Sequence, residues 1–211
     1  MNGRHFLTAV ALLGLCARAV TAGDDGRPLG TGVLSYYCVA RESPGPPDTT
    51  LCTTKGKPLA RVTRRTALAA RLQGTVLLED ARLLNVAGGR CPCAFGPCFM
   101  EVDRKTHPFG LGARGNALVP YRTVAVDPRY IPLGARLFVE GLVGLPIPAA
   151  DGRGTTPHDG CVTAGDVGGG VDRLQIDFFV GACAPDHPAR KLPRHTRVRR
   201  DAARCRAAPA G

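Results

Sequence analysis

Residues 158–181 constrain this chain more than any other segment, because they place two carboxylates around a glycine-rich turn. Asp166 precedes the run Gly168–Gly170, and Asp177 follows eleven residues after Asp166, inside a stretch that alternates like a β-strand. In such a strand the apolar residues share one face, while Asp177 and Gln175 lie on the other. An acid flanked by isoleucine and phenylalanine is costly to bury unless it is paired, hydrated or used in chemistry. The segment therefore predicts a functional site.

The first 22 residues have the pattern of a secretory signal peptide. A basic start precedes an apolar run from Phe6 to Ala17, and the small residues at 20–22 form a cleavage signal. The apolar run is shorter than the roughly 20 residues that span a bilayer, so no transmembrane segment is expected. A lipid anchor on Cys16 is less favoured, because a bulky leucine precedes it. The sequence predicts a periplasmic or secreted protein.

The cysteine count favours disulfides. The chain has nine cysteines, and removal of residues 1–22 leaves eight. An even number in an exported protein indicates disulfide bonds, although the pairing stays open. A zinc site at Cys91–Cys98 is disfavoured, because the spacing is not a paired C-x-x-C and histidines are few. No metal or organic cofactor is expected. The candidate disulfide cysteines are Cys38, Cys52, Cys91, Cys93, Cys98, Cys161, Cys183 and Cys205.

Many glycines and prolines and few helical periodicities predict a small, mainly β domain at 33–184. A polar lead-in at 23–32 precedes it, and a basic tail at 185–211 follows. One short helix is predicted at 66–73, with Leu68 and Leu72 one turn apart and Gly74 as its stop. Strands are predicted at 33–40, 75–84 (as a strand or short hairpin), 118–127, 136–140 and 174–180. The irregular stretch 88–115 is expected to be a disulfide-pinned loop.

From Arg190 onward the tail carries eight cations against a single acid, Asp201. It is either a solvated extension or an attachment to an anionic polymer. A disulfide from Cys205 would tie it to the domain. The chain has no tryptophan and only 5% aromatic residues, so nucleic acid is a poor partner for this exported protein. An anionic cell envelope is the favoured partner.

The motifs as a set resemble the three-aspartate (3D) domain of bacterial cell-wall enzymes, which include membrane-bound lytic transglycosylase A. The matching segments are Tyr121–Gly134, His158–Gly160, Asp166 with its two following glycines, and Ile176–Phe179. The three aspartates are Asp127, Asp166 and Asp177, and the specific match covers residues 118–181.

The resemblance implies a six-stranded double-psi β-barrel and a reaction. That reaction is cleavage of the β-1,4 bond between N-acetylmuramic acid and N-acetylglucosamine in peptidoglycan, with formation of a 1,6-anhydro ring. Asp177 would be the single general acid and base, with Asp166 beside it as a second catalytic residue. A monomer is expected. The expected substrate-binding residues are Asp127, Gly168, Gly169, Gln175 and His158.

Each of these residues also has a structural interpretation. Asp127 is more typical of a turn cap, Asp166 of an acceptor for loop amides, and His158 of a surface histidine. Asp177 itself fits a buried, hydrogen-bonded acid.

One departure from the family pattern affects the substrate and the activity. Asp172 and Arg173 follow the glycine turn where the family commonly has a basic residue and glycine. A non-catalytic, expansin-like wall-binding protein is therefore an alternative, and a disulfide-rich inhibitor is a third.

Overall fold

The computed structural model describes residues 26–88, 91–201 and 203–206. The predicted signal peptide and the first residues of the predicted lead-in lie outside these ranges. Within them, no helix is long and apolar enough to cross a membrane.

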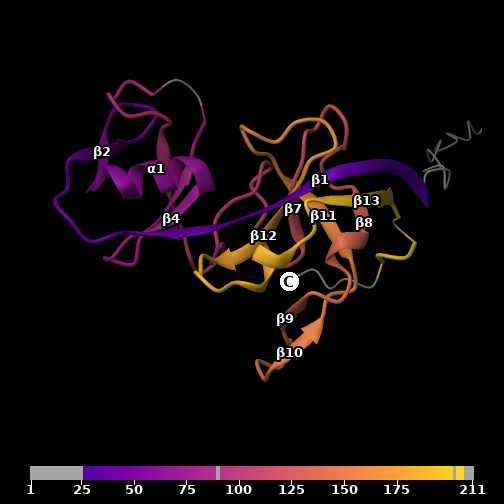
Figure 1. The fold of residues 1–211 in the computed structure, drawn as a ribbon. Helices are drawn as coiled ribbons and strands as arrows, with labels where there is room; N and C mark the ends of the chain where they lie inside the picture. The colour runs from indigo at the N-terminus through magenta and orange to yellow at the C-terminus, as the bar shows by residue number, and fades with distance from the viewer. Residues whose placement is uncertain (1–25, 89–90, 202, 207–211) are drawn as a thin grey trace, which may run out of the picture.

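Six strands close into a ring on the right-hand side of Figure 1. Parallel pairing joins β7 to β11 and β1 to β12, and the other four junctions are antiparallel. The prediction of a mainly β fold with one α-helix and disulfides is confirmed over the described residues. In ring order the strands are β12 (Ile176–Ala182), β7 (Thr123–Ala125), β11 (Cys161–Asp166), β8 (Arg136–Val139), β13 (His195–Arg200) and β1 (Arg27–Arg41).

Strand β1 is 15 residues long and belongs to two parts of the molecule. Residues 27–33 pair with β13, residues 34–39 pair with β12, and Ala40 and Arg41 pair with β4. Figure 1 shows this strand crossing from the ring to the part labelled α1, β2 and β4. The sites on the ring and the elements opposite them are therefore joined by one continuous strand.

The second part of the molecule is a small layer beside the ring. A hairpin of β4 (Thr75–Leu77) and β5 (Leu83–Val86) extends the sheet from β1, and β6 (Phe99–Val102) completes it. This hairpin is the second of the two forms predicted for residues 75–84. The strands β2 (Thr49–Cys52) and β3 (Pro58–Val62), which were not predicted, form a separate pair.

Helix α1 (Arg64–Gln73) packs against this layer and confirms the predicted helix. The Thr63 hydroxyl accepts a hydrogen bond from the Thr66 amide at the N-terminus. Gly74 ends the helix with a φ of 79°, a left-handed conformation that favours glycine.

The side of the helix that packs inward differs from the prediction. The buried residues are Thr66, Ala67 and Ala70, whereas Leu68 is exposed and Leu72 is 80% exposed. Small side chains let the helix backbone lie close to the sheet, so the two leucines face outward.

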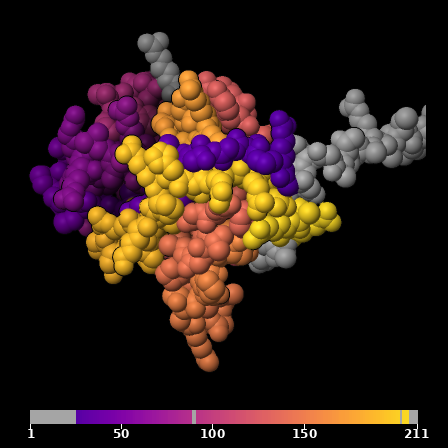
Figure 2. Space-filling model, turned by 45° about the vertical axis from the view of Figure 1, so that its right-hand side comes forward, coloured from indigo at the N-terminus to yellow at the C-terminus, as the bar shows by residue number. Residues whose placement is uncertain are grey.

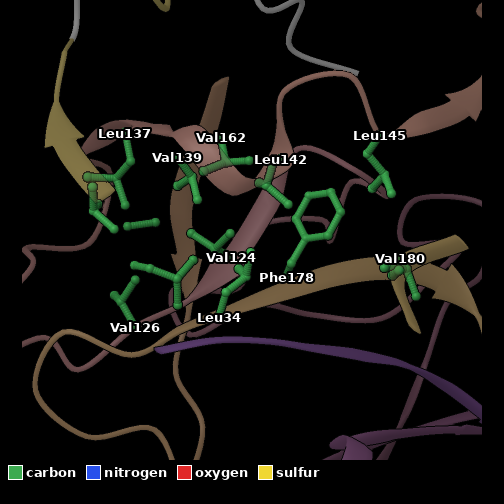
Figure 3. Close-up of a cluster of buried hydrophobic side chains, with 14 of the residues drawn as sticks. Leu34, Val124, Val126, Leu137, Val139, Leu142, Leu145, Val162, Phe178 and Val180 are labelled. Carbon is green, nitrogen blue, oxygen red and sulfur yellow. The ribbon is translucent and has the colours of Figure 1, made fainter. Parts of the chain in front are cut away.

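The interior of the ring is a continuous apolar core, shown in Figure 3. Phe178 from β12 lies in it, fully buried, with Val124 from β7 and Val162 from β11. Alternate β12 residues 176, 178 and 180 enter this core, as the predicted alternation requires. A second cluster, which includes Tyr37 and Phe179, lies on the opposite face of β12 and β1. Both faces of β12 are therefore largely apolar, and Asp177 is an exception.

All eight predicted cysteines form disulfides. Cys38–Cys183 joins the middle of β1 to the residue after β12, with 5.0 Å between the Cα atoms. Cys161–Cys205 joins the start of β11 to the C-terminal segment, with 5.3 Å between the Cα atoms. Cys52–Cys93 and Cys91–Cys98 fasten the predicted loop, although β6 interrupts that loop with a strand.

The predicted lead-in and tail require correction, because both contribute to the ring. Residues from Arg27 onward form β1, and residues 195–200 form β13, which pairs with β1 and β8. In β13 Thr196 and Val198 are buried, and these two inward residues let a mostly basic segment complete the ring.

Other segments also differ from the sequence prediction. The strand predicted at 118–127 is limited to the three residues of β7, and residues 161–166 form β11, a strand that was not predicted. A short hairpin of β9 (Pro146–Pro148) and β10 (Thr155–Pro157) projects at the bottom of Figure 1. The two 3-10 turns are η1 (Glu140–Leu142) and η2 (Pro188–Lys191).

Candidate active site

A cleft of about 520 Å³ lies between the ring and the second layer. Its ring wall includes Asp166 and Asp177, and its other wall is formed by the end of α1 with parts of β4, β5 and β6. Arg71 is the only cation among the lining residues described. This size is in the range of small-molecule and cofactor sites.

Strand register brings the two predicted catalytic aspartates together. Asp166 ends β11 opposite Ala125 of β7, and Asp177 of β12 lies opposite the same alanine from the other side. Neighbouring strands are about 4.8 Å apart, so the two backbones are separated by about 10 Å. Both side chains line the cleft, with the small Ala125 side chain between them. The prediction that Asp166 lies beside Asp177 agrees with this geometry.

Asp177 is half-buried and has no basic partner among the described residues. Its Oδ1 accepts a hydrogen bond of 2.7 Å from the Ser35 hydroxyl, which itself accepts one of 3.1 Å from the Gln175 amide. Burial raises the pKa of Asp177, and the Ser35 hydrogen bond lowers it in part. The second oxygen, Oδ2, receives no hydrogen bond from any described residue and is not enclosed. It is free to face a ligand in the cleft.

Asp166 is held by two donors. The Tyr37 hydroxyl donates to Oδ2 at 2.8 Å, and the Val167 amide donates to Oδ1 at 2.8 Å. Burial raises the pKa of Asp166 to about 6 despite both hydrogen bonds, and the charge of Asp177 adds to the rise. Repulsion between two carboxylates acts on both, so the pair holds one proton more readily than it loses both.

Tyr37 and Ser35 are site residues that the sequence analysis missed. Both lie on β1, which pairs in parallel with β12 so that Ser35 faces Asp177 and Tyr37 faces Phe179. Burial, with the nearby charge of Asp166, raises the pKa of Tyr37 well above its usual range, so the phenol stays a donor. The alternating strand predicted at 33–40 was the available signal, but it did not specify a partner strand 140 residues away.

The predicted glycines lie in the cleft. Gly168 and Gly169 both line it, and a Cβ on Gly169 would meet no atom within 4 Å. Any side chain there would therefore extend into open space at the cleft. Gln175 does not line the cleft and instead orients Ser35.

Asp127, the third aspartate, has a different environment. It is almost fully buried outside the cleft lining, and its carboxylate accepts hydrogen bonds from the Arg129 guanidinium, the shortest being 2.6 Å. The hydrogen bonds from Arg129 hold the pKa of Asp127 well below its usual range. The Arg173 amide also donates to Asp127, at 3.0 Å. This arrangement fits the predicted turn cap, because it fastens the loop after β7 to the loop before β12.

Asp172 and Arg173, which depart from the family pattern, interact with the same two residues, Asp127 and Arg129. Asp172 pairs with Arg129 at 3.0 Å, and neither residue lines the cleft. Arg173 has a φ of 52°, in the left-handed region, which explains why glycine suits this position. The arginine adopts the turn without glycine because Asp127 holds its amide.

His158 is not at the surface, and it is not in the cleft. It is buried, and its Nδ1 accepts a hydrogen bond from the Gly160 amide while Nε2 donates to the Tyr121 carbonyl at 2.7 Å. Burial lowers the pKa of His158, so the ring stays neutral. It supports the loop that leads into β11.

No group of three or more histidine, cysteine, aspartate or glutamate side chains in the described ranges has the geometry to hold a metal ion.

Comparison with known proteins identifies the domain. Residues 122–185 match the 3D domain family. The chain contains a 3D domain. This 3D-domain protein has no match among curated protein sequences.

Solved structures show the same fold. One is MltA from E. coli with bound chitohexaose, at 14% identity and a TM-score of 0.55, over 80% of this chain and 71% of that one. Another is a membrane-bound lytic murein transglycosylase from Agrobacterium tumefaciens, at 11% identity and a TM-score of 0.54, over 81% and 73%. At these identities the likeness concerns the fold.

Proposed function

We propose that this 3D-domain protein is a peptidoglycan lytic transglycosylase with Asp177 as its acid and base. The observation that carries the proposal is a cleft whose ring wall holds Asp166 and Asp177, two half-buried carboxylates without a basic partner among the described residues and each with a raised pKa. Acid catalysis near neutral pH requires such a raised pKa. The related fold of MltA with bound chitohexaose, a β-1,4-linked glycan, supports a glycan substrate.

Hydrogen bonding supports different roles for the two acids. Asp177 has an oxygen without a donor, so a protonated Asp177 would give its proton to the glycosidic oxygen as the bond to C1 breaks. The sugar's C6 hydroxyl would then form the new bond to C1 and return a proton to the Asp177 carboxylate. No water is consumed, and the acid is restored. Asp166, with both oxygens held, would position substrate and favour the proton on Asp177.

The cleft rim fits a sugar chain. Leu72, Met100 and Val167 are exposed apolar side chains that line the cleft, and they would pack against the apolar faces of sugar rings. Gly168 and Gly169 leave backbone amides within reach of a glycan. Arg71 lies among the lining residues as a partner for a carboxylate of the substrate.

The proposal extends to fold and location. We infer that the six-stranded ring is a double-psi β-barrel, supported by its closure and its two parallel junctions, and that the chain acts as a monomer. Four disulfides among the described residues support an oxidising compartment, in keeping with export by residues 1–22.

Digestion of purified sacculi tests the activity. The disulfide-bonded protein, Asp177→Asn and the control Asp172→Asn would each be incubated with sacculi, followed by mass spectrometry of the soluble products. We expect 1,6-anhydro products from the wild type and the control. We expect the rate for Asp177→Asn to be at least about 100-fold lower than the wild-type rate. Products heavier by one water would instead indicate a hydrolase. Binding to sacculi without any product would favour the expansin-like alternative.

A further inference from the structure

Three arginines gather on the outer face of the ring, where β8 and β13 pair. Phe138 lies opposite Arg199 in that pairing, and Arg136 is two residues before Phe138 on the same face of β8. The neighbouring residues Leu137 and Val139 point into the interior core, so Phe138 points outward.

Two guanidinium groups stack on the Phe138 ring. The Arg204 Cζ lies 3.6 Å from the ring centroid, and the Arg199 Cζ lies 5.0 Å from it. Among the described residues, neither guanidinium has an ion pair or a hydrogen-bond partner, and Nε of Arg199 is buried without one. Cation–π contact therefore holds both planar groups in place and leaves their terminal N–H donors unused.

The acids near this surface are already engaged. Glu140 pairs with Arg197 at 2.7 Å, and Asp159 pairs with Arg122 at 2.6 Å. Asp201 is buried, and its Oδ1 accepts a hydrogen bond from the Arg204 amide. The positive charge of the three arginines is therefore uncompensated by these carboxylates.

A disulfide keeps the cluster in place. Cys205 follows Arg204 and joins Cys161, and both cysteines pack against Phe138. The Cys205 carbonyl lies 3.5 Å from the Arg136 guanidinium. In Figure 2 the yellow C-terminal segment lies on the surface against the indigo start of β1. The charges expected on a loose tail are thus partly fixed on the ring, which lowers the entropy cost of binding.

We propose that Arg136, Arg199 and Arg204 form a binding site for the oxyanions of a polymer with repeating phosphate or carboxylate groups. We call these three residues the guanidinium cluster. Planar guanidinium forks match both groups with two parallel hydrogen bonds. The site is separate from the cleft, because Cys161 and Asp166 at the two ends of β11 are about 16 Å apart. A polymer held here would leave the cleft open to a glycan, and the site does not depend on the cleft's chemistry.

Binding measurements test the site directly. The wild type would be titrated with poly(glycerol phosphate), poly-L-glutamate and neutral chitohexaose at low and moderate salt. The double variant Arg199→Gln/Arg204→Gln would be compared with Arg64→Gln/Arg65→Gln, which removes two exposed charges from the start of α1. We expect the first variant to bind the anionic polymers at least about tenfold more weakly, and the control to change less than about twofold. The preferred polymer identifies the anion as phosphate or carboxylate.

A lysine variant separates a built site from diffuse charge. Arg199→Lys/Arg204→Lys keeps both charges but loses the planar forks, so it should bind several-fold more weakly than the wild type. Wild-type affinity in this variant, or equal losses in both glutamine variants, would overturn the proposal. Circular dichroism and unchanged chitohexaose binding would establish that each variant is folded.

Discussion

The aspartates of one motif occupy two contrasting regions of the molecule. Around Asp127 an acid meets a base, because the Arg129 guanidinium donates to both carboxylate oxygens and lowers the pKa. In the cleft, Asp166 and Asp177 are half-buried with neutral donors alone, and their pKa values are raised. An aspartate paired with an arginine stays ionised and holds two loops together, whereas an aspartate that is partly buried without a cation binds a proton more readily. The same residue type thus serves structure in one region and, in the proposed reaction, chemistry in the other.

Removing the Asp127 carboxylate should have the largest effect on the stability of the fold. Asp127→Asn leaves Arg129 and the Arg173 amide without a charged acceptor, so the loop after β7 and the loop before β12 are held together less firmly. We expect the Tm to fall by about 5 °C or more. Because the pKa of Asp127 is lowered in the folded state, its contribution is present above about pH 4 and is lost as the pH falls through the folded pKa. Thermal unfolding at pH 7.5 and pH 3 measures this.

The control for this change is Asp172→Asn, which removes the exposed partner of the same arginine. Its side chain is 66% exposed, and we expect a small change in Tm, since exposed ion pairs contribute little. Equal losses in both variants would contradict the fastening role of Asp127.

Removing the carboxylate of a cleft aspartate should stabilise the folded protein at neutral pH, whereas removing that of Asp127 should destabilise it. The pKa of Asp166 is raised to about 6, so its protonated form stabilises the fold at low pH, and that contribution is lost as the pH rises through about 6. Asp166→Asn should therefore be more stable than the wild type at pH 7.5, by about 2 kcal/mol, with no gain at pH 4. Urea unfolding at the two pH values measures this. A variant less stable than the wild type at pH 7.5 would break the comparison.

The Tyr37 hydroxyl offers the smallest and most selective change. Its hydrogen bond stabilises the Asp166 carboxylate, so Tyr37→Phe should raise the pKa of Asp166 above its value of about 6. Carboxyl carbon NMR during a pH titration measures this shift, and the pH profile of product release should move the same way. Tyr36→Phe, whose ring stacks with His187 instead, should leave the titration unchanged.

The sequence indicated the two cleft acids better than their surroundings. Local alternation predicted the strand of Asp177, and the glycine turn indicated Asp166, since both are signals carried within a dozen residues. Ser35 and Tyr37 could not be assigned, because their role depends on parallel pairing between β1 and β12 across the whole chain. Strand periodicity specifies a face but no partner or register.

Composition misled the prediction at the C-terminal segment. A run rich in arginine indicates a solvated extension, yet Val198 and Thr196 of β13 are buried, and the strand has partners on both sides. Two inward residues and one disulfide were enough to fold it. Deleting the segment would open the ring, so point substitutions test its charges better than truncation does.

The continuity of β1 has a consequence for how the cleft admits a polymer. The strand carries Ser35 and Tyr37 in the ring and reaches β4 in the opposite wall at Ala40, three residues after Tyr37, with a register shift between Tyr37 and Val39. Widening the gap therefore requires bending this strand, and the bulge at Cys38 is its natural hinge. The disulfide from Cys38 to Cys183 restrains β1 at this bulge. We therefore expect the width of the cleft to stay nearly constant when a polymer binds.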